Sequence, residues 1–397
     1  MSFVHLRAAS GYSFKYGTSH ISSLVERAAE FNMPALALTD REKMAGVIRF
    51  AKECEKFGIA PILGVNLSLV QKKYRVTLLA QSGKLPDLYK FLTALNIESN
   101  LGVITNKFIE KYERYSKNLF IMHGPESQLV DALSKRRESE AKGILNSYRE
   151  LFANQAIECV THLVAGDGPF STSLAGKSLA FARDQKIPAV ITNAVRLLDK
   201  RDGPIADILD STRNLTPLSA NTVERKNSEA YLKNSAVMSY LADEISRLAG
   251  ERSGRRLIAT TLEWADATKL SPRRDIGLGN IHLPEPSVVG AKDHLDTSRL
   301  LRSRCEGNIF SKYHGSKSIV AANRLEEELS VVTKLGFETY FLTVADIVDI
   351  AKKLGIRVAA RGSGAGSLIC YLLGISGVEP IDNGLIMERF CSPTRGE

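Results

Sequence analysis

The first two hundred residues alternate between two spacings of apolar positions. Residues 21–32 and 44–58 carry an apolar side chain every three or four positions, which predicts helices. Residues 34–40 and 74–80 are short apolar runs bounded by polar residues, which predicts buried strands. Strands separated by helices indicate βαβ units and a mostly parallel sheet or barrel, in which chemistry gathers at the carboxyl ends of the strands.

The rest of the chain has a different pattern. Residues 205–290 are rich in Ser, Asn and Arg and include helical pieces such as 235–250. The pattern is helical again beyond this segment, and residues 321–336 carry a regular apolar stripe. These changes predict an α/β domain at 1–205, a connector with helices at 206–293 and a further unit at 294–397.

Composition narrows the class of protein. The 397 residues are 44% hydrophobic and 24% charged, which is typical of soluble globular proteins, and no apolar run reaches the roughly 18–20 residues that span a bilayer. The five cysteines are scattered without a C-x-x-C pair, which argues against disulfides or a thiolate zinc site and predicts a cytoplasmic location. The net charge of +9 favours a polyanionic partner without identifying one.

Residues 357–375, RVAARGSGAGSLICYLLGI, predict a short strand, a glycine-serine loop and an apolar helix. Three glycines between 362 and 366 let backbone amides approach a phosphate, and Arg361 adds positive charge at the entrance. The P-loop motif is absent because no Lys follows, and the dinucleotide fingerprint is absent because Ser367 stands where its third glycine would be. A tight turn, in which the glycines only relieve crowding, is the alternative interpretation.

Short motifs around this loop form an ordered, gap-free set over residues 336–390. They are Gly336-Phe337, Tyr340-Phe341-Leu342, Arg361-Gly362-Ser363, Ala365-Gly366-Ser367 and Glu388-Arg389-Phe390. The set resembles the start of the palm in the bacterial DNA polymerase III alpha-subunit family. The segments FVHLRAASGYSF, ALALTD, PILGVNLSL and AVITNAVRLL resemble the PHP (polymerase and histidinol phosphatase) domain of that family. The ending SPTRGE leans toward the error-prone branch.

The resemblance implies a fold and an activity. The fold is an α/β PHP-like distorted (β/α) barrel, followed by a helical connector and an incomplete nucleotidyltransferase palm. The activity is that of a C-family DNA-directed DNA polymerase, in which two Mg²⁺ ions assist attack of the primer 3′-hydroxyl on a deoxynucleotide, in replication or error-prone repair. The implied partners are primer–template DNA, deoxynucleoside triphosphates and other holoenzyme or repair subunits, including a sliding clamp, with no membrane.

The resemblance also assigns roles within the palm segment. The candidate nucleotide-binding residues are Arg361, Gly362, Ser363, Gly366 and Ser367. The catalytic Asp-x-Asp motif would lie beyond Glu397, so we expect this fragment alone to be inactive as a polymerase. Asp346 and Asp349 lie on a predicted helix, and we expect them to be solvated rather than to bind metal.

The PHP-like part departs from the metal-binding pattern of its family. Arg7-Ala8-Ala9 stands where His-x-His would be, and Thr39-Asp40-Arg41 stands where Thr-Asp-His would be. Arginine cannot release its proton to ligate a metal, and alanine has no donor atom. The remaining ligand candidates are Asp40, Glu158 and His162. Arg7, Arg41 and Arg196 stand at positions where the resemblance implies metal ligands.

We therefore expect no metal at this position and a vestigial site in which Arg–Asp and Arg–Glu pairs hold the barrel together. Two alternatives to a polymerase remain open at this point. One is a truncated, non-catalytic binding or scaffold module. The other is a metal-dependent PHP phosphoesterase, which the lost ligands disfavour.

Overall fold

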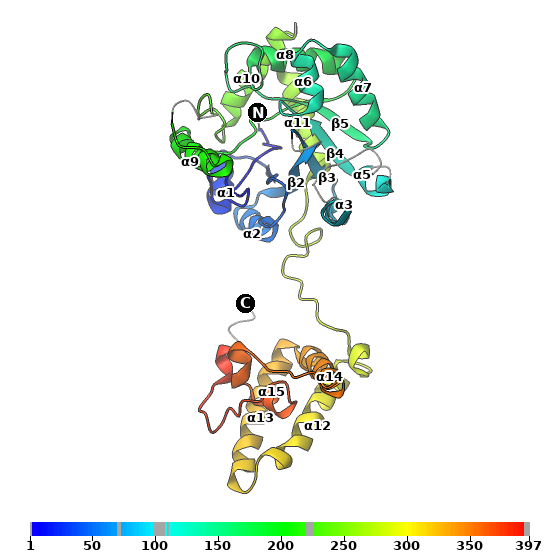
Figure 1. Cartoon of the computed structure of the whole chain (residues 1–397), viewed down its shortest axis with the longest axis vertical. Helices are drawn as coiled ribbons and strands as arrows, with labels where there is room; N and C mark the ends of the chain where they lie inside the picture. The colour runs from blue at the N-terminus through cyan, green and yellow to red at the C-terminus, as the bar shows by residue number, and fades with distance from the viewer. Residues whose placement is uncertain (1, 70–72, 99–107, 109–110, 220–224, 393–397) are drawn as a thin grey trace. The chain divides into compact units, whose positions relative to one another are not determined.

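The computed structural model describes residues 2–69, 73–98, 108, 111–219 and 225–392 (Figure 1). The chain forms two compact units, Met1–Asn280 and Ile281–Glu397. Among the helices within these ranges, none combines the length and the apolar character that crossing a bilayer requires.

The first unit is built on one six-stranded sheet whose strands follow one another in sequence order. Strand β1 pairs in parallel with β2, β2 with β3 and β3 with β4 are antiparallel, and β4, β5 and β6 are parallel. The strands are β1 (Ala35–Leu38), β2 (Ala60–Leu69), β3 (Tyr74–Ala80), β4 (Leu119–His123), β5 (Asn154–Cys159) and β6 (Ala189–Ile191). The antiparallel turn into β3 departs from a uniform βαβ pattern, because a connection this short cannot carry the chain back to a parallel start.

Backbone hydrogen bonds close the sheet into a distorted barrel. On one side, the amide of Ala37 in β1 donates to the carbonyl of His5 at 3.0 Å. On the other side, the amide of Ala9 donates to the carbonyl of Val195, beyond β6, at 2.8 Å. The amino-terminal segment thus lies between the first and last strands, which confirms the α/β barrel predicted from the alternating pattern.

Helices surround the strands of the first unit (Figure 1). They are α1 (Ile21–Glu30), α2 (Val47–Phe57), α3 (Leu85–Glu98), α5 (Glu113–Ser116), α6 (Gln128–Ser134), α7 (Glu138–Arg149), α8 (Thr172–Asp184), α9 (Gly203–Asn214), α10 (Ser235–Leu248) and α11 (Arg255–Thr268), with a 3₁₀ turn η1 (Lys200–Asp202). Their apolar faces bury side chains such as Leu24, Phe50 and Phe91 against the sheet. This burial is the main source of the unit's stability.

Part of the segment predicted as a connector packs directly on the barrel. The side-chain hydroxyl of Thr261 in α11 accepts a hydrogen bond from the amide of Ile191 in β6 at 2.9 Å. Trp264 of the same helix is buried, with its ring centroid 4.8 Å from that of Phe120, so it packs the helix against the sheet. Helix α10 lies so close to α8 that a Cβ added at Gly176 would be 2.8 Å from the Cβ of Leu248.

The second unit is helical throughout its described part. It contains α12 (His294–Lys312), α13 (Ser316–Leu335), α14 (Glu338–Lys353) and α15 (Leu368–Leu372), with the 3₁₀ turns η2 (Pro286–Val289), η3 (Gly362–Gly366) and η4 (Met387–Arg389). Its core includes the buried side chains Leu301, Leu325, Leu329 and Leu342. The strand predicted just before the glycine loop is wrong, because residues 357–361 have no regular secondary structure and no strand lies between 281 and 392 for them to pair with.

Candidate functional site

Arg7 lies at the carboxyl end of the barrel strands, where the closing segment places it between two carboxylates. Its Nη1 donates to Oε2 of Glu158 at 3.1 Å, and its Nη2 forms an ion pair with Glu126. Burial by itself lowers the pKa of Arg7, but the attraction of Glu158 and Glu126 overcomes burial and raises it. Arg7 is therefore a fixed cation in the place where the resemblance implied a metal-binding histidine.

Glu126 follows β4 and connects two arginines. Its Oε1 accepts a hydrogen bond from Nη2 of Arg41 at 3.1 Å while its other oxygen pairs with Arg7. Burial acts to raise the pKa of Glu126, but the guanidinium groups of Arg7, Arg41 and Arg75 outweigh burial and lower the pKa to about 2. Glu126 was not among the residues predicted from the sequence, although its position just after a strand follows the rule that was used for the others.

Glu158, at the end of β5, is the most enclosed carboxylate of the centre. Its Oε1 accepts a hydrogen bond from the hydroxyl of Thr192 at 2.5 Å, and its Oε2 faces Arg7. A Cβ added at Gly124 would lie 2.0 Å from Oε2 of Glu158, so only glycine fits there. The expected Arg–Glu pairing thus involves Arg7 with both Glu158 and Glu126.

Within the described residues, the carboxylate of Asp40 is hydrogen-bonded by serines rather than by an arginine, which differs from the expected Arg–Asp pair. Its carboxylate accepts hydrogen bonds from the amide of Ser10 at 2.7 Å, the hydroxyl of Ser10 at 2.9 Å and the hydroxyl of Ser13 at 2.7 Å. Burial raises the pKa of Asp40, and these hydrogen bonds offset only part of that rise. Asp40 therefore anchors the loop after the closing segment.

Arg196 pairs instead with Asp210 of α9, in two hydrogen bonds of 3.0 Å each. Its Cζ lies 4.1 Å from the ring centroid of Tyr16, and the Cζ of Arg41 lies 3.3 Å from the same centroid. An aromatic ring in contact with two guanidinium groups partly compensates their charges. Tyr16 and Asp210 were both missed from the sequence, because neither occupies a strand end.

The contacts of His162 differ from those of the other two predicted ligands, Asp40 and Glu158. Its Nε2 shares a hydrogen bond with the carbonyl of Asn193 at 3.0 Å, and its ring stacks on Phe170 at 4.6 Å. Burial lowers the pKa of His162 to about 4, so the ring is neutral at physiological pH. Hydrogen bonding to a backbone carbonyl fits a structural histidine.

The glycine loop lies in the second unit, between α14 and α15. Arg361, Gly362 and Ser363 are exposed, and Gly362 has a φ of +76° that favours glycine. Gly366 and Ser367 are buried, and their predicted contact with a nucleotide stays a prediction. The hydroxyl of Ser367 donates to Glu328 at 2.9 Å and also caps α15, so a phosphate could reach Ser367 only if Glu328 moved away.

Two models of known protein families match the chain, one toward each end. The family model for the PHP domain matches residues 5–162, and the model for the bacterial DNA polymerase III alpha NTPase domain matches residues 299–397. The chain shares these two domains with the bacterial DNA polymerase III alpha-subunit family. This confirms the resemblance seen in the sequence motifs.

The alpha-subunit relatives align with essentially the whole chain. The error-prone DNA polymerase of Symbiobacterium thermophilum is 29% identical over 100% of this chain and 36% of its own length. The DNA polymerase III subunits alpha of Pseudomonas aeruginosa and of Buchnera aphidicola from Schizaphis graminum are 28% and 27% identical, each over 34% of its own length. The chain thus spans about a third of the length of the curated relatives it matches.

Solved structures resemble this alpha-subunit chain only in part. A two-domain protein from Bacteroides vulgatus, described as containing a predicted PHP-like metal-dependent phosphoesterase, aligns with a TM-score of 0.34 and 10% identity. That alignment covers 58% of this chain and 63% of the other. The PHP assignment therefore rests on the family model and on the barrel itself.

The side chains at the barrel centre do not fit the metal site of a PHP enzyme. Guanidinium groups of Arg7 and Arg41 face the carboxylates, and a guanidinium group repels a cation and has no lone pair to donate. Within the described part of the chain, no group of three His, Cys, Asp or Glu side chains is arranged to hold a metal ion. The donor chemistry here favours ion pairing over metal binding.

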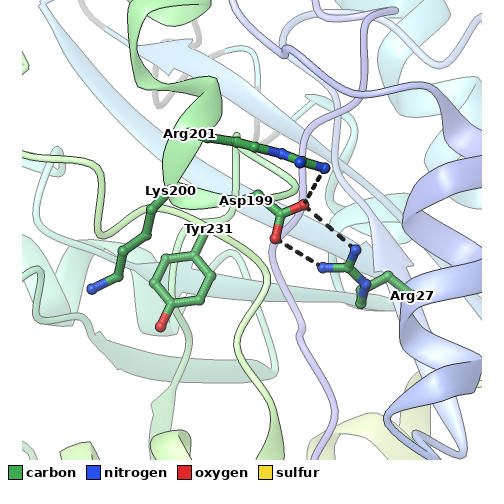
Figure 2. A pocket seen from close by; sticks show the side chains of 5 residues that line it. All are labelled: Arg27, Asp199, Lys200, Arg201 and Tyr231. Carbon is green, nitrogen blue, oxygen red and sulfur yellow. Dashed lines mark hydrogen bonds and ion pairs between the residues drawn. The ribbon is translucent and has the colours of Figure 1, made fainter.

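A cavity of about 450 Å³ lies elsewhere on the first unit (Figure 2). It is lined by Arg27, Asp199, Lys200, Arg201 and Tyr231. Figure 2 shows Asp199 between Arg27 and Arg201, and Lys200 pairs with Glu229 at 2.5 Å. Because each cation of the cavity already has a carboxylate partner, the cavity offers little net attraction to an anionic ligand.

Proposed function

We propose that this chain supplies the PHP and early palm parts of a DNA-directed DNA polymerase of the alpha-subunit type. The observation that carries the proposal is the order of the two family matches, PHP first and polymerase domain second, within relatives that align over the whole chain. Residues 1–205, 206–293 and 294–397 would be the PHP-like domain, the connector and the start of the palm. Relatives named error-prone DNA polymerase and DNA polymerase III subunit alpha align with similar identities, so the proposal includes both replication and error-prone repair.

The proposed role of the second unit is to bind the triphosphate of an incoming deoxynucleotide. The exposed residues Arg361, Gly362 and Ser363 are available for this contact. Primer–template DNA, Mg²⁺ and other polymerase subunits belong to the same proposal through the family. In the reaction, bound Mg²⁺ would neutralise charge that develops on the phosphates. The exposed residues of the loop would bind and orient the triphosphate.

Nucleotide binding by the purified chain tests this role. We expect a fluorescent dATP analogue to bind, and Arg361→Ala to weaken its binding roughly ten- to a hundredfold, since a charge-assisted hydrogen bond contributes roughly 1.5–3 kcal/mol. Lys334→Ala, an exposed cation on α13, is the matched control and should leave the affinity unchanged. Equal loss in both variants, or no binding by the unchanged chain, would contradict the assignment of the loop.

For the barrel centre we propose a structural role without metal or phosphoesterase activity. The support is the pairing of Arg7 with Glu126 and Glu158 in the position of the family's metal site. Isothermal titration with Mn²⁺ and Zn²⁺ is expected to show no tight site on the barrel. Tight binding of more than one ion per chain, together with phosphodiester hydrolysis that a chelator abolishes, would establish the phosphoesterase alternative instead.

A further inference from the structure

The carboxylate of Glu328 is buried at the point where helix α13 meets the glycine loop. Its Oε2 accepts hydrogen bonds from the hydroxyl of Ser367 at 2.9 Å and from the amide of Ile369 at 3.1 Å. Its Oε1 accepts from the amide of Leu368 at 2.9 Å. Each contact crosses about forty residues of sequence, so one carboxylate on α13 fixes the inner end of the loop.

Arg324, one helical turn before Glu328, holds the same stretch from the other side. Its Nη2 donates to the carbonyl of Gly366 at 2.7 Å, and its Nε donates to Oε1 of Glu328 at 3.1 Å. The two side chains together engage the carbonyl of Gly366, the hydroxyl of Ser367 and the first amides of α15. A Cβ at Gly366 would also meet the carbonyl of Ile386 at 2.5 Å, so this end of the loop is tightly enclosed.

The charge of Glu328 matters because each of its oxygens accepts two hydrogen bonds. Oε1 faces the amide of Leu368 and Nε of Arg324, whereas Oε2 faces Ser367 and Ile369. A glutamine has the same shape, but its amide nitrogen would point two hydrogens toward one of these donor pairs. The site therefore requires a carboxylate, and buried donors left without an acceptor are costly.

We propose that Glu328, assisted by Arg324, is the positioning residue of the nucleotide loop. It occupies the inner amides itself, and so leaves the outer end at Arg361, Gly362 and Ser363 as the part that meets a triphosphate. This inference rests on the proposed nucleotide role of the loop. It assigns Gly366 and Ser367 to holding the loop rather than to contacting the ligand.

Cleavage by trypsin after Arg361 tests the positioning without any nucleotide. In Glu328→Gln we expect this cleavage, followed by mass spectrometry, to be on the order of tenfold faster, because proteolysis follows the population of the opened loop. Glu327→Gln is the matched control, since Glu327 is the exposed neighbour on α13. Unchanged cleavage in a folded Glu328→Gln protein would overturn the proposal.

Binding of dATP separates positioning from a purely structural role. We expect folded Glu328→Gln, checked by circular dichroism, to bind dATP about tenfold more weakly, whereas binding by Glu327→Gln stays unchanged. Faster cleavage with unchanged dATP affinity would overturn the positioning role. If the unchanged chain does not bind dATP, the proposed nucleotide function fails, and the cleavage experiment still decides whether Glu328 orders the loop. Arg324→Lys keeps the charge but loses the forked contact. We expect it to speed cleavage and to weaken dATP binding, as Glu328→Gln does, but by a smaller factor.

Discussion

At the scale of single residues, Arg7 is an ion-pair partner of two carboxylates at the barrel centre. Arg7 brings two carboxylates together, as a metal ion would, but it does so with directed N–H donors and a permanent charge. The consequence is that the stability of the centre depends on pH and on charge balance.

The titration of Glu126 provides a test at this scale. Its pKa in the folded protein is about 2, below the ordinary 4.5, so the folded state favours the charged form. This stabilisation is present above pH 4.5 and is lost as the pH falls toward 2, where the unfolded chain binds the proton more readily. Urea denaturation at pH 6 and at pH 2 measures how much unfolding free energy the protein loses on acidification. We expect this loss to be about 2–3 kcal/mol smaller in Glu126→Gln than in the unchanged protein. Equal pH dependence in both proteins would contradict the ion pairing.

Removing Arg7 tests the buried pair directly. Arg7→Met leaves Glu158, whose side chain is only 1% exposed, without its cation, and we expect a loss of about 3–5 kcal/mol in unfolding free energy. Arg201→Met is the control, because the Arg201 side chain is 83% exposed and should change stability by less than about 0.5 kcal/mol. Adding Glu158→Gln to Arg7→Met should recover part of the loss. A failure to recover would show that packing, rather than charge, dominates.

At the scale of elements, close approach between backbones limits the side chains that the strands can carry. Gly64 of β2 lies opposite β3, and a Cβ there would be 2.3 Å from the carbonyl oxygen of Leu78. Gly143 of α7, by contrast, has open space around its missing Cβ. The two glycines therefore differ in what they contribute to their elements.

A pair of alanine substitutions checks this difference. We expect Gly64→Ala to destabilise the first unit by about 1–3 kcal/mol, because the strands must separate to admit the methyl group. Gly143→Ala should instead stabilise it by about 0.5–1 kcal/mol, since alanine favours a helix interior over glycine. Thermal and urea unfolding measure both, and the same sign for the two variants would contradict the proposed clash.

At the scale of the whole molecule, the chain contains two units with separate hydrophobic cores. The second unit also leaves large apolar side chains of α14 and the residues that follow it exposed. They are Tyr340, Ile347, Ile350, Leu354 and Ile356. A small core with much exposed apolar surface favours lower stability.

Calorimetry and limited proteolysis test this difference in stability. We expect two unfolding transitions, with residues 294–397 unfolding and being cut before the barrel. The assignment follows from mass spectrometry of the first fragments released. A single transition, or early cuts within the barrel while 294–397 stays intact, would contradict the expectation.

The sequence by itself determined the class of fold and the resemblance to the family, and it showed arginines and alanines at positions where the resemblance implies metal ligands. These features depend on local information, because the spacing of apolar residues sets helices and strands, and Arg7 or Ala9 cannot ligate a metal in any fold. Only the tertiary structure decided the partners, such as Glu126 for Arg7, Asp210 for Arg196 and Glu328 for Ser367. Such partners lie from fourteen to more than a hundred residues apart in the chain, so they meet only when strand ends and helices converge. For the same reason the sequence could not show that Ser367, predicted to contact the nucleotide, donates a hydrogen bond to Glu328.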